Sequence, residues 1–237
     1  MSTLVLVRHG QARAYEGDSD RLSPLGELQA RRLGDYLIQH GVVADEVYCG
    51  TLERQRRTLE IVGEAFRAAG RAWPELSAEP GWNEYDASGV LGRLLPALAA
   101  KSPPFANLVE AFRDGQASSD RNRHFQRMFE LLMAERERGA LEDVDVEPFV
   151  AFYERVSSAM TRLTASGGNR AVFVFTSGGP IGVCVQRVLE APRSMALKLN
   201  WRVKNSSLTE FVFSSGRISL ESFNALPHLT RDEHSFR

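Results

Sequence analysis

The sequence predicts an α/β fold, a three-layer sandwich with a mostly parallel central sheet, an antiparallel edge and a helical cap insertion. Short strand-like runs at residues 3–7, 45–49 and 171–175 are each followed by a turn and an amphipathic stretch. This strand-then-helix alternation is typical of a parallel sheet. Two further strand-like runs flank the turn at residues 214–216, which indicates a hairpin and therefore an antiparallel edge.

The first strand–helix unit is well marked by its residue types. Residues 3–7 (TLVLV) consist of leucine and β-branched residues, as expected for a strand buried on both faces. The polar residues 13–22 predict a loop. Ser23 is then a suitable N-cap and Pro24 a suitable first helical residue, and apolar side chains recur at helical spacing up to Gly41.

Two more units follow the same order. Residues 45–49 (DEVYC) predict a short strand, and a helix extends from about Leu52 to near Gly70. Residues 171–175 (AVFVF) predict a third buried strand, followed by a glycine-containing turn and an apolar helix that ends near Leu189. The carboxyl ends of parallel strands commonly build ligand sites, so all three turns are candidate site regions.

The remaining segments complete one expected domain, residues 1–237. Residues 208–213 and 217–223 predict the hairpin, and residues 87–165 predict the helical cap insertion. Within the insertion we expect a loop at 114–122 and two helices whose apolar faces pack into a core. These faces contain Phe125, Met128, Phe129 and Leu132 in one helix, and Phe149, Phe152, Tyr153, Val156, Met160 and Leu163 in the other.

Composition and charge restrict the kinds of partner. A chain of 237 residues with 43% hydrophobic and 25% charged residues suits one sizeable globular domain. The formal net charge of -1 provides no overall field that would attract nucleic acid or an anionic membrane. The expected partner is therefore a small molecule bound in a local pocket. The sequence leaves the oligomeric state open and allows a homodimer.

Cysteine usage and the amino terminus indicate a cytoplasmic protein. Cys49 and Cys184 both lie in apolar stretches, which favours buried free thiols over a disulfide framework. The first residues lack the pattern of a signal peptide, and no run reaches the length of a membrane helix.

The tripeptide Arg8-His9-Gly10, directly after the first strand, suggests phosphoryl chemistry. An arginine can hold a phosphate with two hydrogen bonds while a neutral imidazole nitrogen attacks phosphorus, and a glycine lets the ligand approach the backbone. Arg54 follows the second strand and could converge on the same phosphate. The alternatives are a surface turn for the tripeptide and a basic helix face for Arg54, which has Arg56 and Arg57 nearby.

Two further segments contribute candidates. Glu84 lies in the aromatic-rich segment 81–86, where partial desolvation would favour a protonated carboxyl group that can protonate a leaving oxygen. Asp86 is the neighbouring candidate, and a solvated loop carboxylate is the alternative for both. Ser177 and Gly178 open a helix and offer anion-binding N–H and hydroxyl groups, although an N-cap with a glycine turn would look the same.

Taken together, five segments closely resemble the histidine phosphatase superfamily, also called phosphoglycerate-mutase-like. They are LVRHGQA at 6–12, LSPLGELQA at 22–30, TLERQRRT at 51–58, WNEYD at 82–86 and SGGPI at 177–181. The combination of RHGQA and SGG resembles a bacterial branch of that superfamily.

The resemblance implies a role for each matched residue. It makes His9 the residue that becomes phosphorylated, Arg8 and Arg54 the phosphate ligands, and Glu84 the proton donor to the leaving group. Gln11 joins Ser177 and Gly178 as expected substrate-binding residues. Neither a metal nor an organic cofactor is expected.

Two positions depart from the family pattern. Where the family usually has histidine this chain has Ser177, which can donate a hydrogen bond but supplies no positive charge. Loss of one preorganised donor costs on the order of 10²–10³ in rate. Mutase-like members tend to carry asparagine at the position of Tyr15, so the sequence favours a phosphatase.

We therefore expect a phosphomonoesterase that acts through a phosphohistidine intermediate on a small phosphate ester. The alternatives are a phosphoglycerate-mutase-like phosphoryl transferase and a catalytically weak member that binds a phosphorylated ligand. The remaining histidines, His40, His124, His228 and His234, are expected outside the site, although His228 lies in a segment similar to the carboxy-terminal Asn…His-Leu of phosphatase members.

Overall fold

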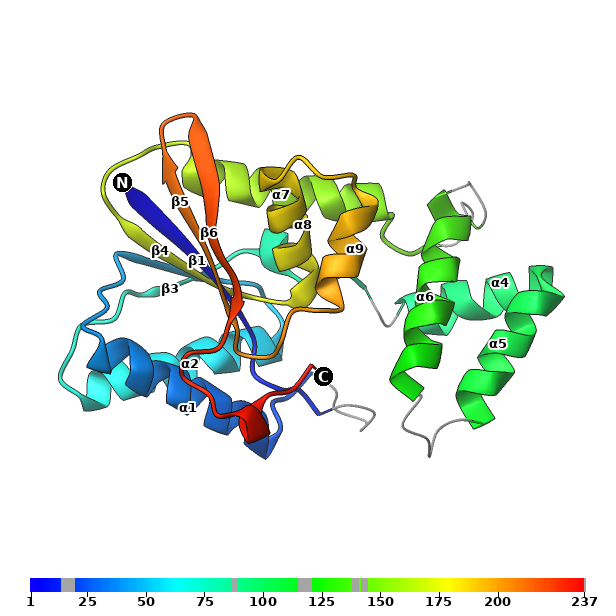
Figure 1. Ribbon diagram of the computed structural model, residues 1–237, viewed down its shortest axis with the longest axis horizontal. Helices are drawn as coiled ribbons and strands as arrows, with labels where there is room; N and C mark the ends of the chain where they lie inside the picture. The colour runs from blue at the N-terminus through cyan, green and yellow to red at the C-terminus, as the bar shows by residue number, and fades with distance from the viewer. Residues whose placement is uncertain (14–19, 87–88, 115–120, 138–140, 142–144, 237) are drawn as a thin grey trace. The chain divides into compact units, whose positions relative to one another are not determined.

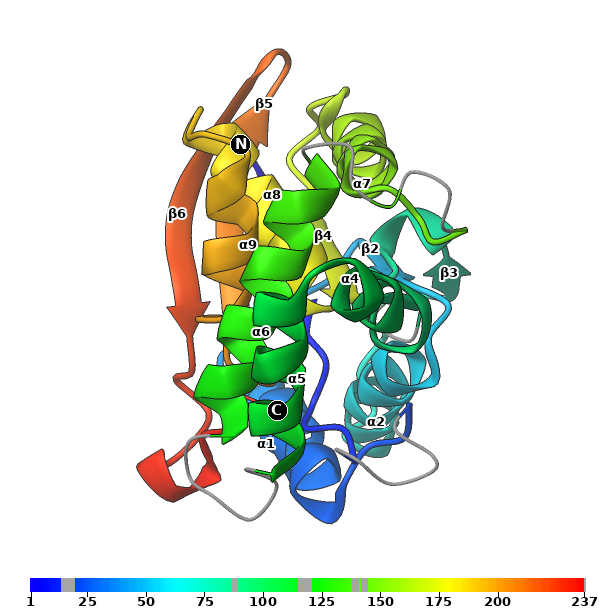
Figure 2. The same cartoon turned by 90° about the vertical axis from the view of Figure 1, so that its right-hand side faces the viewer.

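A computed structural model describes residues 1–13, 20–86, 89–114, 121–137, 141 and 145–236. Its centre is a six-stranded sheet with the order β3-β2-β4-β1-β5-β6, with β6 at one outer edge and β3 at the other (Figure 2). The strands are β1 (Ser2–Arg8), β2 (Glu46–Cys49), β3 (Leu76–Ala78), β4 (Ala171–Thr176), β5 (Leu208–Ser214) and β6 (Arg217–Ala225).

The directions of the strands confirm the predicted fold class. β1, β2, β3 and β4 run parallel, whereas β5 pairs antiparallel with β1 and β6 pairs antiparallel with β5. The predicted hairpin is thus the antiparallel edge. β3 was not predicted, because its three residues, LSA, have too little apolar patterning to indicate a strand.

Helices cover both faces of the sheet (Figure 1). α1 (Pro24–Gln39) and α2 (Glu53–Ala68) lie on one face, and α7 (Phe149–Thr164), α8 (Gly178–Val188) and α9 (Ser194–Asn200) lie on the other. The sheet and the first pair of helices share a buried core, because alternate strand residues and one stripe of each helix are apolar. Its members include Val5, Val7, Leu33, Leu37, Val47, Leu59, Val62, Phe66, Phe173 and Phe175.

The predicted start of α1 is confirmed in detail. Ser23 has extended backbone dihedral angles, its Oγ accepts a hydrogen bond from the N–H of Gly26 at 3.1 Å, and Pro24 is the first helical residue. α1 and α2 end just before Gly41 and Gly70, whose φ angles of 64° and 67° suit glycine.

The chain forms two compact units, Met1–Glu84 with Tyr153–Arg237, and Tyr85–Phe152. The second unit is helical, with η2 (Val90–Leu94), α4 (Leu95–Lys101), α5 (Pro103–Asp114) and α6 (Arg121–Glu137). Phe125, Met128, Phe129 and Leu132 are buried, as the α6 pattern predicted. Residues 115–120 of the predicted 114–122 loop lie outside the described residues, and Arg121 and Asn122 belong to α6. That the two units make one domain stays a prediction.

The sheet brings the ends of three strands together. Arg8 at the end of β1 pairs with Thr176 at the end of β4, and Cys49 at the end of β2 pairs with Phe175. Because these strands are parallel, the residues that follow them emerge at one edge of the sheet.

Cys49 and Cys184 are buried free thiols, as predicted. Burial raises the pKa of Cys49 to about 11 and that of Cys184 to about 12, so both remain protonated at neutral pH. Among the helices of the described residues, none is both long and apolar enough to span a bilayer.

Candidate active site

His9 is the first residue after β1 and is 5% exposed. Its backbone N–H donates to the carbonyl of Thr176 at 2.9 Å, which continues the pairing of β1 with β4. Its Nδ1 lies 2.7 Å from the carbonyl oxygen of Gly10, and its Nε2 lies 3.2 Å from Nε of Arg54. A carbonyl can only accept and a guanidinium can only donate, so Nδ1 carries the hydrogen and Nε2 presents its lone pair.

The surroundings of His9 keep its imidazole neutral. Burial is the main reason that its pKa lies well below the ordinary value of 6.5, and the positive charges of Arg54 and Arg8 lower it further. The hydrogen bond to the carbonyl of Gly10 acts in the opposite direction but does not outweigh them. A neutral imidazole with a lone pair on Nε2 is the form that can act as a nucleophile.

Arg54 belongs to the first turn of α2 and is fixed from two sides. Its Nε donates to His9, and its Nη1 forms an ion pair with Oδ1 of Asp20 at 2.6 Å. The other carboxylate oxygen of Asp20 accepts the backbone N–H of Glu53 at 2.8 Å, at the amino-terminal end of α2. Asp20 therefore holds the side chain of Arg54 and the start of its helix together.

The alternative reading of Arg54 as part of a basic helix face does not match its surroundings. Arg56 pairs with Glu60, and Arg57 pairs with Glu60 and Glu64, on the outer side of α2. The side chain of Arg54 is 19% exposed and is directed at His9 instead.

Arg8 ends β1 and is buried. Its Nη1 donates to the carbonyl oxygen of Val203, in the segment after α9, and its backbone N–H donates to Ser207 at 3.1 Å. Its positive charge contributes to the lowered pKa of His9, after burial and Arg54. Arg8 and Arg54 thus place two permanent positive charges near one imidazole.

Glu84 lies beside the first turn of α8. Its Oε2 accepts a hydrogen bond from the backbone N–H of Gly179 at 3.1 Å. The guanidinium of Arg155 donates to the carbonyl oxygens of Asn83 and Glu84, at 2.8 Å and 3.2 Å, and so fixes the backbone that carries the carboxylate. Asp86, the neighbouring candidate, belongs to the second unit, where its Oδ1 accepts the N–H of Gly89 at 2.8 Å.

Ser177 directly follows β4 and is the N-cap residue of α8. Its side chain makes no capping hydrogen bond, and its Oγ instead accepts from Nε2 of Gln55 at 2.8 Å. The backbone of Gly178 is close to Asn200, since a Cβ on Gly178 would lie 2.3 Å from the side-chain oxygen of Asn200. Glycine is therefore required here for packing within this unit.

Gly10 and Gln11 pack tightly against the start of α1. A Cβ on Gly10 would lie 2.3 Å from the carbonyl oxygen of Gly26, so only glycine fits. Oε1 of Gln11 accepts a hydrogen bond from the hydroxyl of Ser23 at 2.7 Å, and the backbone N–H of Gln11 donates to Oε1 of Gln29 at 2.9 Å. The side-chain oxygen of Gln11 thus binds the N-cap residue of α1, and the NH₂ group is the part of the side chain that can donate to an anion.

The sequence reasoning missed several residues that support the site. Asp20 holds Arg54, Gln55 holds Ser177, and Thr58 accepts the backbone N–H of Gly10 at 3.0 Å. Asn205 donates to the carbonyl oxygen of His9 at 3.3 Å. No local pattern marks these residues, because each acts on a partner at least 34 positions away in the chain.

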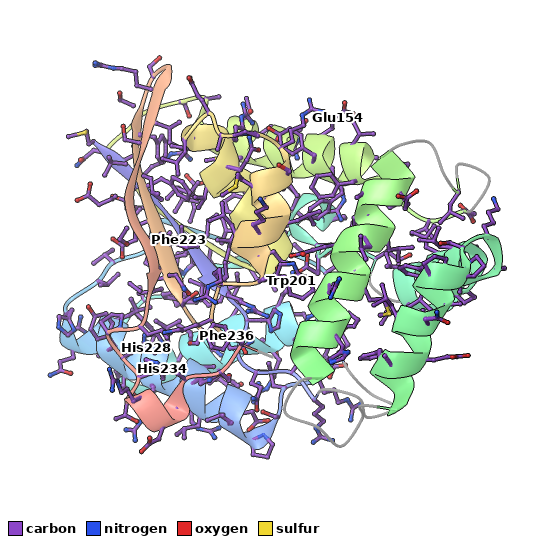
Figure 3. The ribbon with its side chains drawn as sticks, turned by 45° about the vertical axis from the view of Figure 1, so that its right-hand side comes forward. Glu154, Trp201, Phe223, His228, His234 and Phe236 are labelled. Carbon is purple, nitrogen blue, oxygen red and sulfur yellow. The ribbon has the colours of Figure 1, made fainter. Side chains whose placement is uncertain are left out.

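His228 and His234 lie on the segment after β6, with Phe236 beyond them (Figure 3). Nε2 of His228 lies 2.9 Å from Oγ of Ser206, whose backbone N–H donates to the carbonyl oxygen of His9. His228 is therefore linked to the site through Ser206. Tyr15, at the position where mutase-like members tend to carry asparagine, lies outside the described residues.

Comparison with known proteins identifies the class to which this sheet and these residues belong. The model of the histidine phosphatase superfamily, branch 1, matches residues 4–128 and 110–226. The chain belongs to the histidine phosphatase superfamily, which contains phosphatases and mutases.

One curated relative that matches part of the chain is named as a mutase. A 2,3-bisphosphoglycerate-dependent phosphoglycerate mutase from Thermobifida fusca is 42% identical over 79 residues, which span 31% of each chain. The matched region is thus about a third of that relative's length.

Solved structures match over nearly the whole chain. A phosphoserine phosphatase mutant from Entamoeba histolytica, in complex with phosphoserine, has a TM-score of 0.60 at 20% identity and covers 97% of this chain and 100% of its own. A phosphoglycerate mutase from Bacillus anthracis has a TM-score of 0.63 at 19% identity, over 96% and 94%. At such identities these structures establish the fold alone.

Proposed function

We propose that the protein is a phosphomonoesterase that acts through a phosphohistidine intermediate. The observation that carries this proposal is the state of His9, whose Nε2 lone pair faces Arg54 while Nδ1 is held by Gly10. A buried neutral imidazole near two arginines suits attack on a phosphate ester, because the arginines can neutralise the anion as the imidazole forms a bond to phosphorus.

In the first step Arg8 and Arg54 orient the phosphoryl group, with the NH₂ group of Gln11, the hydroxyl of Ser177 and the backbone of Gly178 as further donors. Nε2 of His9 forms a bond to phosphorus as the bond from phosphorus to the leaving oxygen breaks. Glu84 transfers a proton to that oxygen, so the product leaves as an alcohol.

In the second step water attacks the phosphorus of phosphohistidine. The carboxylate of Glu84, now deprotonated, takes a proton from the water. The bond from phosphorus to Nε2 breaks, its electron pair returns to His9, and inorganic phosphate is released. The two arginines supply the positive charge in both steps, so the proposed cycle requires neither a metal nor a cofactor.

The contact between Arg54 and His9 has to change when substrate binds. Its Nε–H is directed at the lone pair that forms the new bond, so the guanidinium must turn from His9 to the phosphoryl oxygens. Nη1 of Arg54 can remain paired with Asp20 during this rotation, so that end of the guanidinium serves as the pivot.

The substrate class is a small phosphate ester. Relatives and structural neighbours named as phosphoglycerate mutases make a mutase the second candidate, in which phosphohistidine returns its phosphoryl group to a hydroxyl of the substrate. A panel with an aryl phosphate, phosphoserine and 3-phosphoglycerate covers both activities.

The test compares wild-type protein with His9→Ala in the presence of a chelator, with the release of inorganic phosphate as the measurement. We expect the wild type to release phosphate and to form an acid-labile phosphoprotein on rapid quenching, and His9→Ala to do neither. Arg56→Gln, on the outer side of α2, is the matched control and should retain the wild-type rate.

Three results would contradict the proposal in different ways. Equal rates for wild type and His9→Ala would reject attack by His9. Isomerised phosphate ester with little free phosphate would identify a mutase. Tight binding of phosphate esters without turnover or phosphohistidine would identify a binding protein.

Location in the cytoplasm and assembly into a homodimer stay predictions. Cell fractionation would check the first, and light scattering would check the second.

A further inference from the structure

Ser177 occupies the position where this family usually places a second histidine. It is completely buried, and it follows Thr176, whose carbonyl oxygen accepts the backbone N–H of His9. Two residues further along the chain, the backbone N–H of Gly179 donates to Glu84. The turn that contains Ser177 therefore contacts both the proposed nucleophile and the proposed proton donor.

The orientation of the Gln55 amide beside Ser177 is settled by chemistry. Its side-chain nitrogen lies 3.1 Å from the carbonyl oxygen of Trp82 and 2.8 Å from Oγ of Ser177. A backbone carbonyl only accepts hydrogen bonds, so the atom that faces Trp82 must be the NH₂ group. The same NH₂ group then donates its second hydrogen to Ser177.

This donation determines what the Ser177 hydroxyl can do. Because Oγ accepts from Gln55, its hydrogen remains available as a donor. Within the described part of the chain, no group accepts a hydrogen bond from this hydroxyl, and the side chain does not cap α8.

We propose that Gln55 is a positioning residue that fixes Ser177 as a hydrogen-bond donor to the transferring phosphoryl group. The pair would take the place of the family's second histidine. This inference rests on the proposed phosphatase function and adds a residue to it. A hydroxyl contributes no positive charge, so its effect depends on being held ready to donate before the reaction begins.

Two packing features support a dedicated role for the Gln55 amide. Gly50, after β2, provides space for it, because a Cβ there would lie 2.0 Å from Oε1 of Gln55. Oε1 itself is buried without a hydrogen-bond partner in the described structure, which is unfavourable for folding. An apolar side chain of similar length would avoid this cost, so the function of the residue lies in its NH₂ group.

The test is a double-mutant cycle of kcat for an aryl phosphate, with Gln55→Met, Ser177→Ala and the double variant. We expect Ser177→Ala to lower kcat on the order of 10²-fold, as for other preorganised donors, and Gln55→Met to lower it on the order of 10-fold. In the Ser177→Ala background, Gln55→Met should change kcat by less than about twofold, because a positioning residue has no effect without its partner.

Gln55→Glu gives a second measurement that keeps the side-chain shape. An ionised carboxylate accepts from Ser177 and draws the hydroxyl hydrogen inward, whereas a protonated carboxyl group can donate as the amide does. We expect this variant to regain activity as the pH falls, and the added pH dependence to be absent from Ser177→Ala with Gln55→Glu. A purely structural role for Gln55 would give no such dependence.

The outcomes separate this inference from the proposed function. If His9→Ala retains the wild-type rate, the phosphatase mechanism fails first. If His9→Ala is inactive but Ser177→Ala keeps the wild-type kcat, the mechanism stands and the inference is overturned. Losses that multiply in the double variants, or a Gln55→Glu variant with the wild-type pH profile, also overturn it. All rates are measured where circular dichroism shows each variant folded.

Discussion

Nε of Arg54 donates a hydrogen bond to Nε2 of His9 across 3.2 Å. The cation thereby stabilises the lone pair of the neutral ring, and protonation of Nε2 would break this contact and place a third positive charge beside Arg8 and Arg54. Burial is the main cause of the neutral state of His9, and this contact adds to it. In the proposed mechanism the same contact is the one that Arg54 gives up when substrate binds.

The first prediction concerns the pH dependence of kcat/KM. Burial, Arg54 and Arg8 lower the pKa of His9, so the nucleophilic neutral form persists well below pH 6.5. We expect the acid limb of kcat/KM that belongs to His9 to lie below pH 6.5. Removing a positive charge should raise the pKa, so in Arg54→Gln the limb should move to higher pH. An acid limb at or above pH 6.5 in the wild type would contradict this account.

The second prediction concerns the leaving group. Glu84 is proposed to protonate the leaving oxygen, and an alkoxide needs that proton far more than an acidic nitrophenolate does. We expect Glu84→Gln to lower kcat/KM, which reports the first step alone, by about 10²–10⁴-fold for an alkyl phosphate and much less for a nitrophenyl phosphate. Equal losses for the two esters would show that Glu84 is not the proton donor. Glu60→Gln, on the outer side of α2, is a control that should leave both rates unchanged.

The third prediction concerns Gln29, which ties the start of the chain to its end. Its Oε1 accepts the N–H of Gln11, and its Nε2 donates to the carbonyl oxygen of Glu233 and to Oγ of Ser235 at 2.7 Å and 3.0 Å. Ser235 in turn donates to Asn205, which donates to the carbonyl oxygen of His9. The segment after β6 thus braces the turn that holds His9.

We expect Gln29→Met to lower the free energy of unfolding by about 1–3 kcal/mol, because it leaves partly buried polar groups of Gln11, Glu233 and Ser235 without this partner. Denaturant unfolding is the measurement, and kcat should fall as well. Arg32→Gln removes an exposed ion pair with Glu233 and should cost less than about 1 kcal/mol. Equal effects of the two substitutions on the free energy of unfolding would show that the hydrogen bonds of Gln29 do not stabilise the protein.

The fourth prediction concerns the stability of the protein in acid. Burial lowers the pKa of His228 from 6.5 to about 4, and its Nδ1 is buried without a hydrogen-bond partner in the described structure. Between these two pH values the unfolded chain binds the proton and the folded protein does not. The contribution of His228 to stability is therefore complete above pH 6.5 and is lost as the pH falls towards 4.

The loss from His228 amounts to about 3 kcal/mol over this range. His228→Gln keeps a donor for Ser206 but does not titrate, so it should reduce the pH dependence of the unfolding free energy by that amount. Parallel pH profiles for wild type and His228→Gln would contradict the prediction.

The sequence by itself determined the elements whose causes are local. The apolar run of β1, the Ser23-Pro24 start of α1 and the glycines after α1 and α2 depend on neighbouring residues, and local patterns report them directly. The sequence also indicates that Arg8 and His9 belong to one site, because the two residues are adjacent in the chain. β3 was missed because three residues carry too little pattern.

Only the tertiary structure decided how the candidate residues contact one another. The chain could not reveal which nitrogen of His9 presents its lone pair, that Asp20 holds Arg54, or that Gln55 donates to a serine 122 positions away. The physical reason is that short-range periodicity fixes helices and strands. The direction of a single hydrogen bond depends instead on strand register and side-chain packing, which arise once distant segments of the chain have come together.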